Sequence, residues 1–277
     1  MIYLKDVSYQ YPDGTVALKN INLRINKGEF LAIMGQNGAG KTTLIRLLNG
    51  LLRPTSGTVY FDQQDISNQS IASMSTKVGI IFQNPVHQLF SNTVEDEIRF
   101  SLKSMNLTQS EIEKKTLETL QRYNFVKYKN RSPINLSGGE AKKLAIASIM
   151  CRDPEVLVFD EPTLGQDAKE ISLFTELLNS EKEKKKTIIV VTHNIEFAFQ
   201  YIPRIILMNK GRILADGPSF KLLTNEFLVK NASLIYPQFY SFVIGLRKIG
   251  INVPDDIIKD FELIEFLSSY IKNQMIS

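Results

Sequence analysis

Cysteine is almost absent from the 277-residue sequence, in which Cys151 is the single example. One thiol cannot form a disulfide within its own chain, and it cannot supply a metal site built from several cysteines. A reducing compartment such as the cytoplasm is therefore the expected setting.

The sequence also has little that would place it in a membrane. No apolar run approaches the roughly 18–20 residues that a membrane helix needs, and the start, MIYLKDVSYQYPDG, has no signal-peptide pattern. We expect a soluble chain that reaches a membrane only through a partner.

A strong charge of either sign is missing too. Against 29 Asp and Glu, the 33 Lys and Arg leave a net charge of +4, which is too small an excess to indicate nucleic-acid binding. The cluster EKEKKK at residues 181–186 is more typical of a solvated turn than of a binding patch. No nucleic-acid partner is expected.

What the sequence does contain begins with a pattern of antiparallel strands. Two alternating segments, residues 2–11 and 16–25, are separated by the turn Pro12-Asp13-Gly14. Three later apolar runs, at 78–83, 155–160 and 187–193, have the length of buried strands, and the last two are rich in valine and isoleucine. These patterns predict an α/β fold with a mixed sheet and an N-terminal antiparallel β-subdomain.

Helical patterns complete the predicted domain organisation. A mostly helical stretch at about 91–150 predicts an α-helical subdomain inserted into the core. A hairpin is expected at 204–217, and short helical pieces follow it. We therefore predict one main domain over 1–218 and a small C-terminal helical extension over 219–277.

The strongest chemical motif is GQNGAGKT at residues 35–42, which fits the phosphate-binding pattern G-x-x-x-x-G-K-[ST] between a buried strand and a helix. Its glycines let backbone N–H groups point at an anion, and the helix dipole adds positive potential. Lys41 is expected to reach the terminal phosphates, and the Thr42 hydroxyl to bind Mg²⁺. The candidate ATP-binding residues here are Gly35, Gln36, Asn37, Gly38, Ala39, Gly40, Lys41, Thr42 and Thr43.

A pair of acids supplies the second half of this predicted site. Asp160 ends the strand pattern EVLVFDE, where it could hold the magnesium shell, and Glu161 follows it as the candidate to polarise an attacking water. Adjacent acids at a strand end are common, but with Lys41 and Thr42 they predict a nucleoside triphosphatase. Kinases, GTPases, helicases and transport ATPases all remain open at this point.

The stretch LSGGEAKKLAIA, residues 136–147, separates these classes. By itself it fits an ordinary helix capped by Ser137. LSGGE, however, resembles the LSGGQ signature of the ATP-binding cassette (ABC) ATPases, and it stands where that family places it, after the helical insertion and before the acidic strand. Further motifs resemble the family's in order and approximate spacing, at Tyr11, Gln83, Gly165, Gln166, Asp167 and His193.

This resemblance implies roles for the matching residues. Tyr11 would stack on adenine, and Gln83 would contact Mg²⁺ and report to the transport partner. His193 would hold the γ-phosphate and water in line for Glu161, the general base. Seen alone, Tyr11 could be a core aromatic, Gln83 a strand cap and His193 a satisfied strand-end histidine.

The resemblance also implies that two subunits work as a head-to-tail dimer. In ABC ATPases the signature of one subunit closes on the ATP held by the other. Ser137 would hydrogen-bond the γ-phosphate, and Gly138 and Gly139, followed by Glu140, would permit the backbone to contact it. Asp167 would communicate across the dimer. A free helix start carries the N–H groups that such a phosphate needs.

Two features resemble the ATPase subunits of energy-coupling factor (ECF) transporters, which import vitamins and metal ions such as cobalt and nickel. The segment FQNPVHQLF at 82–90 is similar to their FQNPDNQ-type loop, although Val86 and His87 replace an acid and an amide. The tail YPQFYSFVIGLRKIGINVPDDIIKDFELIEFL is similar to their C-terminal extension, which helps to hold two ATPases together. The tail's apolar spacing is equally compatible with packing on its own domain.

Three departures from the family pattern bear on activity. Glu140 replaces the commonest glutamine of the signature, Lys143 replaces an arginine, and Gln166 replaces an apolar residue beside Asp167. Glu140 could lie on the exposed side of the helix or weaken closure on ATP.

The resemblance therefore implies an ECF-type ATPase subunit that uses ATP and Mg²⁺. Its partners would be a second ATPase subunit, identical or related, and integral membrane transport subunits at the cytoplasmic face of the membrane. The alternatives are the ATPase of another ABC transporter, a soluble ABC protein acting on nucleic acid or ribosomes, and a non-catalytic regulatory cassette.

Overall fold

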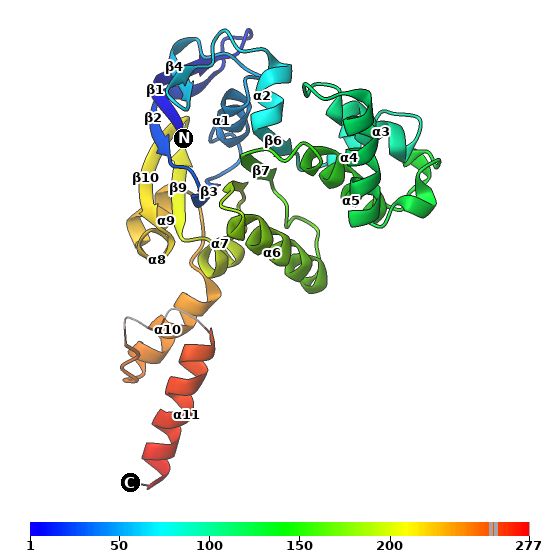
Figure 1. Ribbon diagram of the computed structural model, residues 1–277. Helices are drawn as coiled ribbons and strands as arrows, with labels where there is room; N and C mark the ends of the chain where they lie inside the picture. Colours follow the sequence, from blue (N-terminus) through cyan, green and yellow to red (C-terminus); the bar gives the residue numbers. More distant parts are fainter. Residues whose placement is uncertain (255–256, 258–259, 277) are drawn as a thin grey trace.

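The computed structural model describes residues 1–254, 257 and 260–276. Two sheets and a set of helices form the body of the molecule, and the C-terminal helices project away from it (Figure 1). Asp255, Asp256, Ile258, Lys259 and Ser277, which belong to the predicted extension, lie outside the described residues.

The first sheet is antiparallel and has the strand order β2-β1-β4-β5. Its alternating residues place one face on the core, as the sequence predicted. Its strands are β1 (Ile2–Gln10), β2 (Val16–Ile25), β4 (Ser56–Phe61) and β5 (Gln64–Asp65).

The second sheet has the order β10-β9-β3-β8-β7-β6 and is parallel except for the antiparallel β9–β10 hairpin. The buried-strand runs of the sequence form its centre, which confirms the predicted α/β fold with a mixed sheet. Its strands are β3 (Phe30–Met34), β6 (Val78–Ile81), β7 (Val156–Asp160), β8 (Thr187–Val191), β9 (Arg204–Asn209) and β10 (Arg212–Pro218).

Helices cover both faces of the second sheet, which is why its central strands are apolar throughout. Helix α1 (Lys41–Leu48) packs between one face and the antiparallel sheet, in a cluster that includes Leu31 and Ile33. Phe30 and Ala32 point to the opposite face, where they join a cluster with α6, α7 and α8. These helices are α6 (Ala168–Glu183), α7 (Ile195–Tyr201) and α8 (Ser219–Leu223), while α2 (Ile71–Lys77) precedes β6.

A helical lobe lies to one side of the sheets (Figure 1) and has a core of its own. Phe125, Leu120 and Leu144 are fully or almost fully buried in it. The capping box that the sequence predicts at Thr108 and Glu111 begins its helix α4. The lobe contains α3 (Val94–Leu102), α4 (Gln109–Arg122), α5 (Gly138–Met150) and the short 3₁₀ helices η1 (Pro85–Gln88), η2 (Val126–Tyr128) and η3 (Pro133–Asn135).

The C-terminal segment divides by its packing into two parts. Leu222, Leu223 and Ala232, from α8 and from the end of α9 (Glu226–Asn231), belong to the core beneath the second sheet. By contrast, α10 (Gln238–Lys248) and α11 (Asp260–Ile276) enclose a separate small cluster that includes Val243 and Leu246. The domain boundary at 218 stays a prediction. Within the predicted extension, α8 and α9 pack on the core and α10 and α11 pack together.

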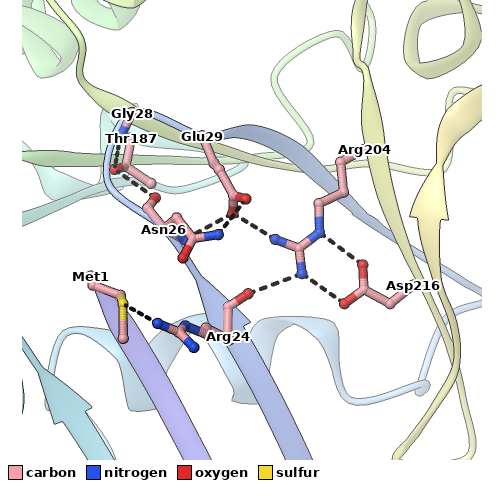
Figure 2. Close-up of polar contacts among 8 residues, drawn as sticks. All are labelled: Met1, Arg24, Asn26, Gly28, Glu29, Thr187, Arg204 and Asp216. Atoms are coloured by element: carbon pink, nitrogen blue, oxygen red, sulfur yellow. Dashed lines mark hydrogen bonds and ion pairs between the residues drawn. The ribbon is translucent and has the colours of Figure 1, made fainter.

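An arginine links the two sheets at the end opposite the predicted phosphate loop (Figure 2). The Arg204 guanidinium, on β9, donates to Asp216 at 2.7 and 2.8 Å, to Glu29 at 2.5 Å and to the Arg24 carbonyl at 2.9 Å. Hydrogen bonding to Asp216 raises the pKa of Arg204. Because Arg24 belongs to β2, this contact fixes the antiparallel sheet against the mixed one.

No helix within the described part of the chain is both long and apolar enough to cross a membrane.

Candidate nucleotide site

The carboxyl ends of four parallel strands bring the predicted site residues to one edge of the mixed sheet. β3 leads into the loop 35–40, β6 into Gln83 and β8 into His193, while β7 ends at Asp160. In open α/β sheets ligands bind outside the carboxyl ends of the strands. Motifs that are up to 158 residues apart in sequence therefore meet, because their strands are neighbours in the sheet.

Close backbone approach explains the glycines of the phosphate loop. Gly35 has φ 147°, and a Cβ there would lie 2.2 Å from the Met208 carbonyl oxygen. Gly40 has φ 100°, and its Cβ would lie 2.6 Å from the Ala17 carbonyl oxygen. Only glycine fits either position, so the loop stays wrapped against β9 and β2.

Lys41 is folded back onto this loop. Its ammonium donates to the Gly35 carbonyl at 2.7 Å and to the Gln36 carbonyl at 3.1 Å. Burial lowers the pKa of Lys41, while the nearby carboxylates of Glu161 and Asp160 act to raise it. The cation is thus held inside the loop in which phosphate oxygens would lie.

A pocket of about 300 Å³ gathers most of the candidate residues from the two sheets. It joins the antiparallel sheet, the phosphate loop, the residue after β6 and the acidic end of β7. Its lining residues are Tyr11, Thr15, Val16, Ala17, Asn37, Gly38, Gly40, Lys41, Thr42, Thr43, Gln83, Asp160 and Glu161.

Asp160 is the buried acid of this pocket. Burial is the main cause that raises the pKa of Asp160, and the neighbouring Glu161 carboxylate raises it further. Lys41 and a hydrogen bond from Thr42 act to lower it. A divalent cation at this position would lower the pKa of Asp160, because its positive charge would stabilise the buried carboxylate.

Glu161 and His193 form a pair at the edge of the pocket. The His193 Nδ1 lies 2.9 Å from one Glu161 oxygen, and the His193 backbone N–H donates to the other at 3.3 Å. Glu161 adopts a left-handed conformation with φ 50°, while its own N–H donates to the Val191 carbonyl at 2.8 Å. Such a conformation costs on the order of 1–3 kcal/mol for a residue other than glycine, and here it turns the carboxylate toward the histidine.

Tyr11 lies at the opposite wall, above the start of α1. Its hydroxyl forms a 2.9 Å hydrogen bond with the Thr43 hydroxyl, and its ring packs edge-on against Tyr9 at 4.9 Å between centroids. The ring is therefore fixed beside the phosphate loop with its hydroxyl already satisfied, which leaves its face for a planar group.

The signature segment does not line this pocket within the described residues. Ser137 begins α5 as its N-cap, and added Cβ atoms at Gly138 and Gly139 would meet no other atom within 4 Å. These glycines are not required by packing inside the chain. They leave a helix start open to a ligand from outside.

The structure assigns Glu140 a local partner that sequence reasoning missed. Its carboxylate accepts from the Ser137 N–H and from the Ser137 hydroxyl, both at 2.8 Å, while the Ser137 hydroxyl accepts from the Glu140 N–H at 3.3 Å. These hydrogen bonds lower the pKa of Glu140. The spacing S-x-x-E before a helix is the sequence signal that could have identified this capping box.

Asp167 also caps a helix, at the start of α6. Its side chain accepts from the Glu170 N–H at 2.8 Å, and the Glu170 carboxylate accepts in return from the Asp167 N–H at 3.3 Å. Beside it, Gln166 has a buried side-chain oxygen with no hydrogen-bond partner among the described residues. Asp167 thus lies outside the pocket that contains Lys41 and Asp160.

Comparison with known proteins adds independent evidence. Residues 18–164 match the ABC transporter family. The energy-coupling factor transporter ATP-binding protein EcfA of Methanothermobacter thermautotrophicus is 38% identical over 91% of this chain and 82% of its own length.

Two solved structures superpose on most of the chain. One is cbiO1 from Clostridium perfringens, described as part of the ABC transporter complex cbiONQ, with a TM-score of 0.71 and 34% identity over 87% of this chain and 97% of that one. The other is a dimeric ATP-binding cassette in a post-hydrolysis state with ADP and Pi, with a TM-score of 0.69 and 31% identity over 79% of this chain and 99% of that one.

Proposed function

Because the chain belongs to the ABC transporter family, in the branch of the energy-coupling factor ATP-binding proteins, we propose that it hydrolyses ATP to power an importer of a vitamin or of a metal ion such as cobalt or nickel. The observation that carries the site assignment is the single pocket that contains Tyr11, Lys41 and Asp160. It offers an aromatic ring for a nucleotide's base, a cation for its phosphates and a carboxylate for the metal ion.

The oxygen groups of the pocket fit Mg²⁺. A hydroxyl from Thr42, an amide from Gln83 and a carboxylate from Asp160 line the pocket. The Thr42 hydroxyl is hydrogen bonded to the Asp160 carboxylate. Magnesium prefers such oxygen ligands and shares its shell with phosphates and water. Bound there, it would neutralise charge that develops on the phosphates.

In the proposed reaction Glu161 accepts a proton from the attacking water. His193 leaves its hydrogen bond to Glu161 and donates to the γ-phosphate, which frees a carboxylate oxygen for the water. Lys41 exchanges the Gly35 and Gln36 carbonyls for phosphate oxygens. In this scheme the pair seen between Glu161 and His193 is the resting arrangement.

A second ATPase subunit completes the proposed site. Ser137, Gly138 and Gly139 lie outside the pocket that contains Lys41 and present an open helix start, which suits the phosphate of a partner's ATP. The related cassette with ADP and Pi is dimeric, which supports pairing of two subunits. ATP would then hold the subunits together until hydrolysis separates them.

An exposed aromatic patch beside the Gln83 loop supports docking to membrane subunits at the cytoplasmic face. Phe90 is 65% exposed and Phe100 47% exposed, and their rings pack edge-on at 4.7 Å. They border a surface pocket of about 260 Å³ with Arg99 and Lys103. Exposed paired aromatics are typical of a protein interface, and Arg99 beside them is already ion-paired with Glu95 and Asp96.

The extension also presents apolar side chains to solvent. Phe242 on α10, Ile249 directly after it and Ile264 on α11 are each more than half exposed. We include in the proposal that this extension strengthens pairing of the two ATPases.

Substitution of Lys41 tests the proposed function directly. Lys41→Ala in the full chain should reduce ATP hydrolysis at least about 100-fold, because the phosphates lose their buried cation. The exposed Lys114→Ala on α4 is the matched control. Unchanged ATPase activity in Lys41→Ala, or absence of nucleotide binding by the native chain, would refute the proposal.

Affinity purification from solubilised membranes tests the transport role separately. Co-elution of integral membrane subunits supports an ECF or another ABC transporter, and identification of a separate solute-binding membrane protein selects the ECF type. Recovery with ribosomes or DNA, and none with membranes, would favour a soluble ABC protein instead.

A further inference from the structure

The C-terminal extension is attached to the helix that follows the candidate hydrolytic pair. The first backbone N–H of α10, at Gln238, donates to the Glu196 carboxylate at 2.6 Å. Glu196 belongs to α7, which begins two residues after His193. We propose that α7 couples the state of the Glu161–His193 pair to the position of the extension, and that Glu196 is the positioning residue of this connection. The inference rests on the proposed function.

The start of α7 is tied to the candidate site by short contacts. Asn194 caps the helix by accepting from the Phe197 N–H at 3.0 Å, and its amide donates to the Thr163 hydroxyl at 3.4 Å. The preceding residue, His193, is held by Glu161 through both its ring and its backbone. A change in the partner of His193 therefore acts on the first turn of α7.

The far side of α7 contacts the extension. The Phe199 ring lies 5.9 Å from that of Phe239 in α10, and 6.1 Å from that of Phe220 in α8. Figure 1 shows α7 between the sheets and α10. Because α10 and α11 share their own apolar cluster, a shift of the first turn of α10 moves the two helices together.

A second polar connection holds the base of the extension to the phosphate loop. The Gln36 amide donates to the Asn209 side-chain oxygen at 3.2 Å, and the Asn209 amide donates to the Asn231 carbonyl at the end of α9 at 2.6 Å. The base of the extension is thus hydrogen bonded through Asn209 to the phosphate loop, while in this proposal its first helix follows His193. This arrangement converts a small shift of α7 into a rotation of α10 and α11.

Distances between spin labels in the full chain test the inference. Labels at Ser180→Cys, exposed on α6, and Ser268→Cys, exposed on α11, report the position of the extension. Cys151 is a partly buried free thiol whose pKa is raised by burial to about 12, so a chain carrying only Ser180→Cys is the control that shows whether it takes up label. An excess of unlabelled chain removes distances between subunits.

The expected result is a change of about 2 Å or more in the mean label distance between MgADP and a non-hydrolysable MgATP analogue. Glu196→Ala should reduce this change by at least half without altering nucleotide affinity. Glu196→Gln, which keeps an acceptor oxygen for Gln238, should restore it, and the exposed Glu118→Ala on α4 should behave as the native chain.

An equal distance in both nucleotides for the native chain would overturn the coupling. So would a full distance change in Glu196→Ala, which would show that Glu196 does not position the extension. If the native chain binds neither nucleotide, the proposed function fails and the inference falls with it. Binding with no movement of α11 refutes the inference alone.

Discussion

At the scale of single residues, buried polar atoms without partners are the informative exceptions. The Tyr123 hydroxyl is buried, and it neither donates nor accepts a hydrogen bond among the described residues. Burial raises the pKa of Tyr123 to about 12 from its usual value of 10.0. A group that stays neutral in the fold, and ionises more readily when unfolded, makes stability depend on pH.

Tyr123→Phe should therefore leave stability unchanged or slightly higher at neutral pH, and make the chain clearly more stable than the native one at alkaline pH. At pH 7 we expect unchanged or slightly higher stability, by up to about 1 kcal/mol, because an unpaired buried hydroxyl is removed. Between pH 10 and 12 the unfolded native chain releases the phenolic proton that the folded chain retains. Native stability then falls by at most about 1.4 kcal/mol per pH unit through this group.

Urea unfolding at pH 7 and pH 11 measures both effects. Tyr123→Phe should lose less stability than the native chain between the two pH values. Tyr201→Phe, at an exposed tyrosine, should lose as much as the native chain. A variant that is less stable than the native chain at pH 7 would show that the hydroxyl has a stabilising partner.

At the scale of the element, α5 shows how one helix start can serve two purposes. In the isolated chain Glu140 holds the Ser137 hydroxyl and backbone N–H. In the proposed dimer the same hydroxyl must turn to a partner's γ-phosphate. The capping box therefore competes with closure, and its carboxylate adds a negative charge beside the phosphate.

Glu140→Gln should relieve this competition. The amide retains an acceptor for Ser137 but removes the charge, so we expect ATP-driven pairing to tighten about three- to tenfold, in line with roughly 1 kcal/mol for a charge at a helix start. Analytical ultracentrifugation in the presence of ATP, and the KM for hydrolysis, measure the change.

Glu111→Gln is a matched control, because Glu111 forms the same capping box with Thr108 at the start of α4. It should alter neither quantity. Weaker pairing in Glu140→Gln would show that the carboxylate assists closure.

At the scale of the whole molecule, the C-terminal segment is partly core and partly appendage. Leu222 and Leu223 pack beneath the mixed sheet, whereas Val243 and Leu246 pack only within the second cluster. The two parts should respond differently to deletion.

A chain ending at Tyr236 should fold with near-native stability but pair more weakly in ATP, since it lacks only α10 and α11. A chain ending at residue 218 should be destabilised by several kcal/mol, because each buried leucine that is lost costs roughly 2–5 kcal/mol. Thermal unfolding and sedimentation distinguish these effects. Unchanged pairing in the chain ending at Tyr236 would remove the dimerisation role of the extension.

The sequence by itself determined the fold class and the chemistry of the site. Buried strands carry a local pattern of apolar residues, and the phosphate loop is one contiguous segment, so neither needs distant contacts to be recognised. The capping partner of Glu140 was equally local, at the S-x-x-E spacing, although only the structure drew attention to it.

Tertiary structure alone decided which residues meet. The strand order β3-β8-β7-β6 brings Gln83 and Asp160 to Lys41, and it leaves Ser137 and Asp167 outside their pocket. Strand order and the contact between Glu196 and Gln238 depend on packing between distant segments, which no short stretch of sequence encodes. The same packing joins α8 and α9 to the core and leaves α10 and α11 to form a cluster of their own.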